Sequence, residues 1–324
     1  MKLINKLTIA VAVTLAALTA SASDYPNKPI RLVVPLAAGG GGDVAARLVA
    51  TELAGILGQN VIVENKAGAS STIGTSYVAK SEADGYTLLF VTDFHSINEA
   101  MNRLGKLQGK LPYDSLRDFE AVGQVLDLQI ALLASQKSGI KSMRELTAKA
   151  KAMNGGMSAG MLGEGSPHYL AFLNMQQMGG YKLIEVPYGG SGPATVAVQA
   201  GEVDLAFSTV GAGVQMEKNN RVTVLAVSGP ARDPLAPNVP TIAESGYPGF
   251  SIQSWMGILA PKGVSPDKLK MLNAALNKAL VAPELVKKIK AAGMYPAPRS
   301  REQFTTLIAQ EADKLEKIYK NVNK

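Results

Sequence analysis

IRLVVPLAAGGGGDVAARLVATELAGIL, residues 30–57, joins an apolar run, a glycine-rich loop and an amphipathic stretch. The run IRLVVP is mostly apolar and is bounded by turn residues, which predicts a buried strand over residues 30–35. Apolar side chains then recur at helical spacing, so we expect a helix over residues 43–57 that ends at Gly58. A strand that leads through a loop into a helix opens an α/β fold.

The same alternation continues along the chain. Residues 61–64 and 86–91 have the character of strands, and residues 73–80 between them have that of a helix. A βαβαβ order implies parallel strands with crossover helices between them.

The pattern changes near Pro112, where a turn begins. Residues 121–125 and 130–135 look like strands, and we place the crossing into a second lobe there. Four further strands and three helices follow, with strands over residues 156–159, 183–187, 203–208 and 222–228 and helices over 143–153, 166–178 and 193–200. Residues 251–260 look like a strand that returns to the first lobe, followed by helices over 266–280, 283–292 and 301–322.

We therefore expect an α/β chain with two open, mostly parallel sheets joined by a hinge. The first lobe is predicted over residues 24–125 and 252–324, and the second over residues 126–251. This is the layout of a hinge-bending binding protein, with the ligand between the lobes at the carboxyl ends of the strands.

The N-terminus has the features of a secretory signal peptide. Lys2 and Lys6 precede an apolar run over residues 7–20, and Ala20-Ser21-Ala22 is the small-residue pattern at which such peptides are cleaved. The run is shorter than the roughly 20 residues needed to span a bilayer. We assign residues 1–22 to a signal peptide and expect a periplasmic protein.

Composition excludes several classes of site. The chain has no cysteine, so it has no disulfide, thiolate metal site or lipid-modified cysteine. Its net charge of +7 is not concentrated in one block, and aromatic residues make up only 6%, which argues against a nucleic-acid partner. The positive field is better suited to attracting anionic solutes.

Four loops rich in glycine and serine each join a predicted strand to a predicted helix. Glycine lets the backbone approach a ligand, and a helix N-terminus adds unpaired N–H donors, so such loops can hold a carboxylate. The first two loops, residues 35–43 and 66–74, contribute the candidates Leu36, Ala37, Gly39, Gly40, Gly41, Gly42, Asp43, Ala69, Ser70, Ser71 and Thr72. The third and fourth loops, residues 163–168 and 188–193, contribute Gly163, Gly165, Ser166, His168, Tyr188, Gly189 and Ser191.

Some of these residues also have an ordinary structural explanation. Asp43 is expected to cap its helix rather than touch ligand, one of the second loop's hydroxyls can be an N-cap, and Ser166 precedes a proline in the manner of a cap. His168 is expected to act as a helix-start donor or packing residue. The candidate set is completed by Thr92, His95 and Asp204, the last as a bond to a loop across the cleft or to a polar ligand group.

No catalytic machinery is recognisable. The two histidines, His95 and His168, lack the spacing of metal ligands, and no Gly-x-Ser-x-Gly motif occurs. An exported hydrolase of a small ester or amide remains an alternative, but no nucleophile–base pair is visible. We predict no catalytic residue, no metal and no cofactor.

The mature chain resembles a known family along its whole length. The resemblance rests on YPNKPIRLVVP (25–35), the Gly39–Asp43 loop, VENKAGA (63–69), DGYTLL (84–89), LPYDSLRDF (111–119), GSPH (165–168), VPYGGSGPA (186–194), GEVD (201–204) and WMGILAP (255–261). These motifs are similar to those of the Bug family, the substrate-binding receptors of tripartite tricarboxylate transporters related to the citrate receptor TctC.

The resemblance implies a Venus-flytrap fold without cofactor, and the first two loops as the place where the carboxylate is held. It implies that the solute is delivered to integral-membrane transporter subunits, or presented to a sensor kinase. Paired loops on each lobe suit a small carboxylate, a dicarboxylate or tricarboxylate above all, and we expect a monomer. Two departures stand out, since the family usually has Ser or Thr at Gly42 and often Gly-Asn at Ser71-Thr72. Residues 103–110 look like a surface insertion.

Overall fold

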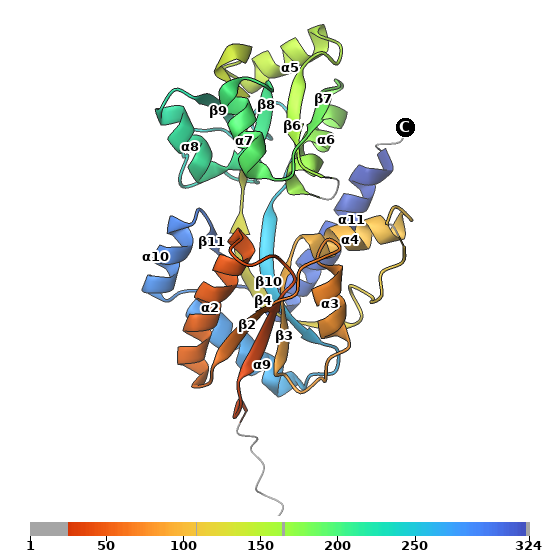
Figure 1. Cartoon of the computed structure of the whole chain (residues 1–324), viewed down its shortest axis with the longest axis vertical. Helices are drawn as coiled ribbons and strands as arrows, with labels where there is room; N and C mark the ends of the chain where they lie inside the picture. The colour runs from red at the N-terminus through yellow and green to blue at the C-terminus, as the bar shows by residue number, and fades with distance from the viewer. Residues whose placement is uncertain (1–24, 108, 164–165, 322–324) are drawn as a thin grey trace, which may run out of the picture.

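The apolar run that follows Tyr25 forms the strand predicted for it. The computed structural model describes residues 25–107, 109–163 and 166–321, and the predicted signal peptide lies outside this range. Two α/β lobes lie one above the other (Figure 1), which confirms the predicted two-lobed fold. Within the described ranges, no helix is both long and apolar enough to cross a membrane.

The first lobe is built around a six-stranded sheet. Its elements are β1 (Ile30–Val34), α2 (Gly41–Leu57), β2 (Val61–Asn65), α3 (Thr72–Ala79), β3 (Thr87–Thr92), α4 (Phe94–Arg103), β4 (Phe119–Leu128), β10 (Ser254–Pro261), α9 (Pro266–Ala279), α10 (Pro283–Ala291), β11 (Tyr295–Pro296) and α11 (Arg301–Asn321). The strand order is β11-β4-β10-β3-β1-β2.

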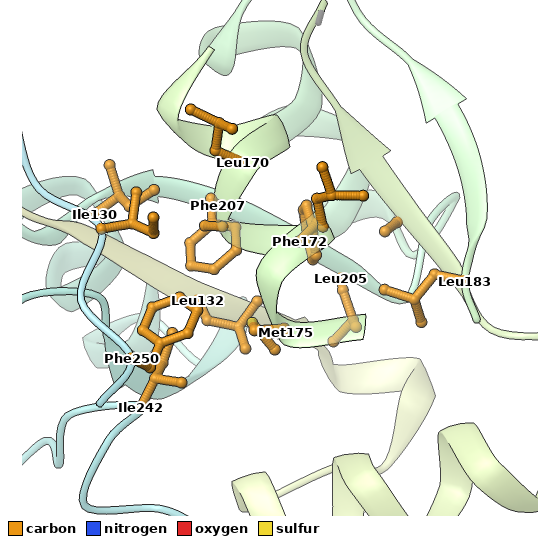
Figure 2. Close-up of a cluster of buried hydrophobic side chains, with 14 of the residues drawn as sticks. Ile130, Leu132, Leu170, Phe172, Met175, Leu183, Leu205, Phe207, Ile242 and Phe250 are labelled. Carbon is orange, nitrogen blue, oxygen red and sulfur yellow. The ribbon is translucent and has the colours of Figure 1, made fainter. Parts of the chain in front are cut away.

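The second lobe has a five-stranded sheet of order β7-β6-β8-β5-β9. Its elements are β5 (Ile130–Ser135), the short 3₁₀ helix η1 (Gln136–Ser138), α5 (Met143–Ala152), β6 (Ser158–Met161), α6 (Pro167–Gly179), β7 (Ile184–Pro187), α7 (Ser191–Ala200), β8 (Leu205–Thr209), α8 (Val210–Lys218) and β9 (Val222–Val227). Figure 2 shows part of its core, where Phe172 of α6 meets Phe207 of β8 with ring centroids 4.7 Å apart.

Both sheets are mixed, so the prediction of mostly parallel sheets is wrong. The βαβ units give parallel pairs, β1 with β2 and β3, and β6 with β7 and β8. The strands that carry the chain between lobes run the other way, since β10 is antiparallel to β3 and β4, and β5 is antiparallel to β8 and β9. The chain leaves the first lobe along β4 and returns along β10, so these two neighbouring strands run in opposite directions.

Among the described residues, three segments of the chain run between the lobes or pack against both. The first is the junction of β4 and β5 at Gln129, and the second is the segment between β9 and β10. The third is α11, which contacts β4 in the first lobe and α6 in the second, where Gln177 Nε2 donates to the Ile318 carbonyl at 3.1 Å. On the β11 side, Tyr295 OH donates to Asp233 Oδ1 of the second lobe at 2.5 Å.

Candidate functional site

The first loop leads from β1 directly into the N-terminus of α2. Gly39 adopts a left-handed conformation with φ of 83°, which glycine alone enters without strain, and Gly40 is the N-cap. The helix begins at Gly41, two residues before the predicted start. Because the first intrahelical bond runs from Val44 N to Gly40 O, the N–H groups of Gly41 and Gly42 have no acceptor within the helix. This end of α2 therefore offers donors and a partial positive charge.

Asp43 holds this loop in place. Its Oδ2 accepts bonds from Gly39 N and Arg47 Nε, both at 2.9 Å, and its Oδ1 accepts from Asn65 Nδ2 at 2.8 Å. The bond from Arg47 is the main reason that the pKa of Asp43 falls to about 2. Asp43 is thus a charged, fully paired residue in the first turn of α2 that stabilises the loop. The expectation that it caps the helix is wrong, because the N-cap is Gly40.

The second loop is strained. Three consecutive residues that are not glycine, Ala69, Ser70 and Ser71, have φ of 46°, 49° and 73°. Each left-handed residue costs about 1–2 kcal/mol. Asn98 Nδ2 donates to the Ser70 carbonyl at 2.8 Å, which helps to fix the loop. Such strain concentrates at functional sites, where the surrounding structure maintains it.

The second loop leads directly into the N-terminus of α3. Ser71 is the N-cap but its side chain makes no capping bond, so the expectation of a hydroxyl N-cap is wrong. The Ser71 carbonyl accepts hydrogen bonds from Thr75 N and Thr75 Oγ1. Thr72 N donates a hydrogen bond to the Ala69 carbonyl. The next N–H groups of α3 lack intrahelical acceptors, as at α2.

A third strand of the first lobe ends beside these two loops, because β3 pairs with β1 in parallel. Thr92 closes β3, is buried, and its hydroxyl has no partner among the described residues. Asp93 follows, is also buried, and accepts a 2.5 Å bond from Ser254 Oγ of β10. Burial raises the pKa of Asp93 to about 7. Sequence reasoning missed Asp93, although its position after an apolar strand was a usable signal.

His95 has a packing role. Its side chain is buried, its Nε2 lies 2.8 Å from the Ser115 carbonyl, and its ring stacks on Tyr113 and meets Phe119 edge-on. Burial lowers the pKa of the imidazole. The structure therefore gives this candidate a place in the core of the first lobe rather than on the loops.

In the second lobe, the third loop ends in the cap predicted for it. Ser166 Oγ accepts Tyr169 N at 3.1 Å and Pro167 is the first residue of α6. Both ring nitrogens of His168 are buried and have no partner among the described residues. Burial lowers the pKa of His168 to about 4, so its imidazole is neutral at pH 7. Gly163 is exposed, and Gly165 lies outside the described residues.

The fourth loop starts α7 at Ser191, with Gly190 as N-cap. Ala194 N is the first to bond within the helix, to Gly190 O, so Ser191 and Gly192 present free helical N–H groups. Gly189 is exposed, and Tyr188 is half-buried on the sheet.

Asp204 is misplaced in the prediction. It precedes β8, and its Oδ2 accepts Ser158 N at 2.8 Å and Ser158 Oγ at 3.0 Å. Ser158 begins β6, which is parallel to β8. Asp204 therefore lies at the amino ends of these strands, at the opposite edge of the sheet from the third and fourth loops.

The loops of the two lobes face each other. The first and second loops lie on the side of the first lobe that is turned toward the second lobe (Figure 1). Helices α2 and α3 on one lobe and α6 and α7 on the other all begin after the carboxyl end of a strand. No group of three or more His, Asp or Glu side chains suited to a metal occurs in the part of the chain that the structure describes. The arrangement supplies neutral donors for an anion from both sides.

Comparison with known proteins agrees with this geometry. Residues 45–324 match the family described as Tripartite tricarboxylate transporter family receptor, TctC. The chain belongs to this family. It is 34% identical to Protein BugT of Bordetella pertussis over 310 residues, 96% of this chain and 94% of BugT. Among solved structures, Rpa4515 of R. palustris with adipate is 29% identical with a TM-score of 0.78, covering 92% of this chain and 98% of that one.

A second solved structure is MatC of Rhodopseudomonas palustris with bound malate, 29% identical with a TM-score of 0.74, covering 91% of this chain and 99% of that one. The periplasmic binding protein BugD is 30% identical with a TM-score of 0.74, covering 92% of this chain and 99% of BugD. The TctC family is one of substrate-binding receptors rather than enzymes, and its relatives include periplasmic binding proteins with carboxylate ligands.

Proposed function

We propose that this protein is a periplasmic receptor that captures a small dicarboxylate or tricarboxylate between its lobes and delivers it to a tripartite tricarboxylate-type membrane transporter. The observation that carries the proposal is the pair of helix N-termini on each lobe, α2 and α3 against α6 and α7. Donors that are already oriented hold an anion without the cost of ordering flexible side chains. The adipate and malate bound by related proteins support the ligand class.

The remaining assignments belong to the same proposal. Residues 1–22 are a cleaved signal peptide, and the receptor is a monomer. One moving body comprises residues 24–128 with 252–324 and the other residues 129–251; the boundary lies three residues later than the predicted 125, because β4 pairs with β10 up to Leu128. Presentation of the ligand to a sensor kinase would use the same site. An exported hydrolase finds no support, since Ser166 Oγ serves as a helix cap and no bond joins it to His168.

The test is a thermal-shift screen of residues 24–324 against mono-, di- and tricarboxylates and their neutral amides. A ligand at about 100 times its Kd adds about 2.7 kcal/mol of stability. We expect shifts from carboxylates alone. Shifts from the amides, with none from the acids, would refute the proposal.

Two matched variants locate the site on α2. Gly40→Leu places a side chain at the helix N-terminus, where a Cβ meets nothing closer than the Ala37 carbonyl at 3.6 Å, so the fold tolerates it. Gly55→Leu places the same side chain in open space farther along the helix. The shift should disappear in Gly40→Leu and persist in Gly55→Leu.

A further inference from the structure

Two glycines of the ligand loops are covered by apolar side chains. A Cβ atom built on Gly42 would lie 2.4 Å from Leu36 Cδ1 and 3.9 Å from the Met256 methyl group. A Cβ atom built on Gly68 would lie 2.6 Å from Ile73 Cδ1. Each glycine thus makes room for a branched aliphatic side chain that lies over its own loop.

The position of Leu36 is fixed by its surroundings. Its carbonyl accepts Asn65 Nδ2 at 3.2 Å, which ties it to the same asparagine that holds Asp43. Its side chain packs against the apolar core of the first lobe. The Leu36 side chain therefore lies beside the free N–H groups at the start of α2. It can do so only because Gly42 has no side chain.

The charged side chains of the first two loops are both engaged elsewhere. Asp43 is paired with Arg47 and Asn65. Lys66 Nζ lies 4.3 Å from the centre of the Tyr77 ring. Between residues 36 and 42 the chain has no polar side chain at all. On the side formed by residues 36–42, an anion at α2 is thus met by backbone N–H groups and, around them, by carbon.

These features decide which carboxylates can occupy the proposed ligand site. We propose that Leu36 and Gly42 form a specificity pair that selects acids with an unsubstituted carbon next to the carboxylate over 2-hydroxy acids. A hydroxyl on that carbon that faces Leu36 would be buried against an aliphatic side chain that offers no hydrogen-bond partner, which is unfavourable. The preferred solutes are aliphatic or aromatic acids of low polarity. This inference rests on the proposed function and narrows it.

The test compares acids of equal charge and length by calorimetric titration of residues 24–324. The pairs are succinate with malate, and adipate with its tetrahydroxy analogue galactarate. We expect the unsubstituted acid of at least one pair to bind at least tenfold more tightly. Equal affinities, or tighter binding of the hydroxy acids, would overturn the inference and leave the proposed function intact. Failure of every carboxylate to bind would overturn both.

Variants assign the selectivity to the two residues. In the double variant Leu36→Ala, Gly42→Ser, the first substitution removes Leu36 Cδ1 and the second places a hydroxyl near its position. The preference for the unsubstituted acid should then shrink at least tenfold. Leu116→Ala, at an exposed position of the first lobe, is the matched control and should keep it. If the double variant is misfolded by circular dichroism, Leu36→Ala alone, which only removes atoms, replaces it. An unchanged preference in the folded variant would refute the role of the pair.

Discussion

Replacing Asp93 with asparagine should remove a large pH dependence of stability. Asp93 is 7% exposed, so solvent screens its charge little, and the charge of Glu311 acts in the same direction as burial. Its pKa is about 7 in the folded protein against 3.8 for the ordinary side chain. Between these two values the folded chain keeps a proton that the unfolded chain has released, so stability falls as pH rises.

The size of the effect follows from the two pKa values. Each tenfold change in proton affinity is worth 1.36 kcal/mol, so the rise from 3.8 to about 7 corresponds to about 4 kcal/mol. Asparagine is close in shape, stays neutral, and its carbonyl can accept the bond from Ser254 Oγ. We expect Asp93→Asn to match the wild type near pH 4 and to be more stable by about 4 kcal/mol at pH 8.

The assay is urea unfolding from pH 4 to pH 8, followed by the fluorescence of the buried Trp255. Asp267→Asn, which changes an exposed aspartate in the first turn of α9, is the control and should leave the pH dependence unaltered. A difference between Asp93→Asn and wild type that is the same at every pH would show that Asp93 is charged throughout and would refute the reasoning.

Three further predictions concern the pairs that fix the loops and the lobes. The pKa of Asp43 is lowered to about 2, so the stability that its charge contributes is present above about pH 4 and is lost as pH falls through 2. Asp43→Asn should remove this loss, which acid titration followed by circular dichroism would measure. Asn98→Ala releases the strained carbonyl of Ser70, so titration calorimetry should find carboxylate affinity at least tenfold weaker, and an unchanged Kd would contradict the role of the strain. Tyr295→Phe removes a bond to the buried Asp233 and should cost about 2 kcal/mol in urea unfolding, and no cost would mean that the contact contributes nothing.

Local patterns predicted most of the fold because its strands are short apolar runs between turns. Helix α4 was missed, since buried His95, Ser96 and Asn98 interrupt the apolar spacing expected of a helix. Their partners are the carbonyls of Ser115, Ile308 and Ser70, which are 20, 212 and 28 residues away. Local sequence patterns therefore could not reveal these contacts. Helix α8 was missed for a different reason, because two glycines weaken its helix propensity.

The candidate loops were found because strand, glycine and helix follow each other in the sequence. The backbone dihedral angles of a loop decide which of its side chains point at the ligand. The left-handed conformation of Ala69, Ser70 and Ser71 could not be predicted, because none of the three is glycine. Ligands bind at the carboxyl edge of a parallel sheet, whereas Asp204 precedes its strand and so lies at the amino edge. Asp93 satisfied that rule.

Helix α11 is anchored at both ends, against β4 in one lobe and against α6 in the other. The β4–β5 junction and the β9–β10 segment alone would let the lobes both bend and twist relative to one another. Helix α11, which packs to one side of these two connections, restricts the twist. Leu315 and Ile318 of α11 lie in an apolar cluster that contains residues of α4 in the first lobe and of α6 in the second, so a closing motion would have to slide these side chains past α6 or carry the end of the helix along. If the lobes close as proposed, the last turns of α11, far in sequence from every ligand loop, would help to set the direction of that closure.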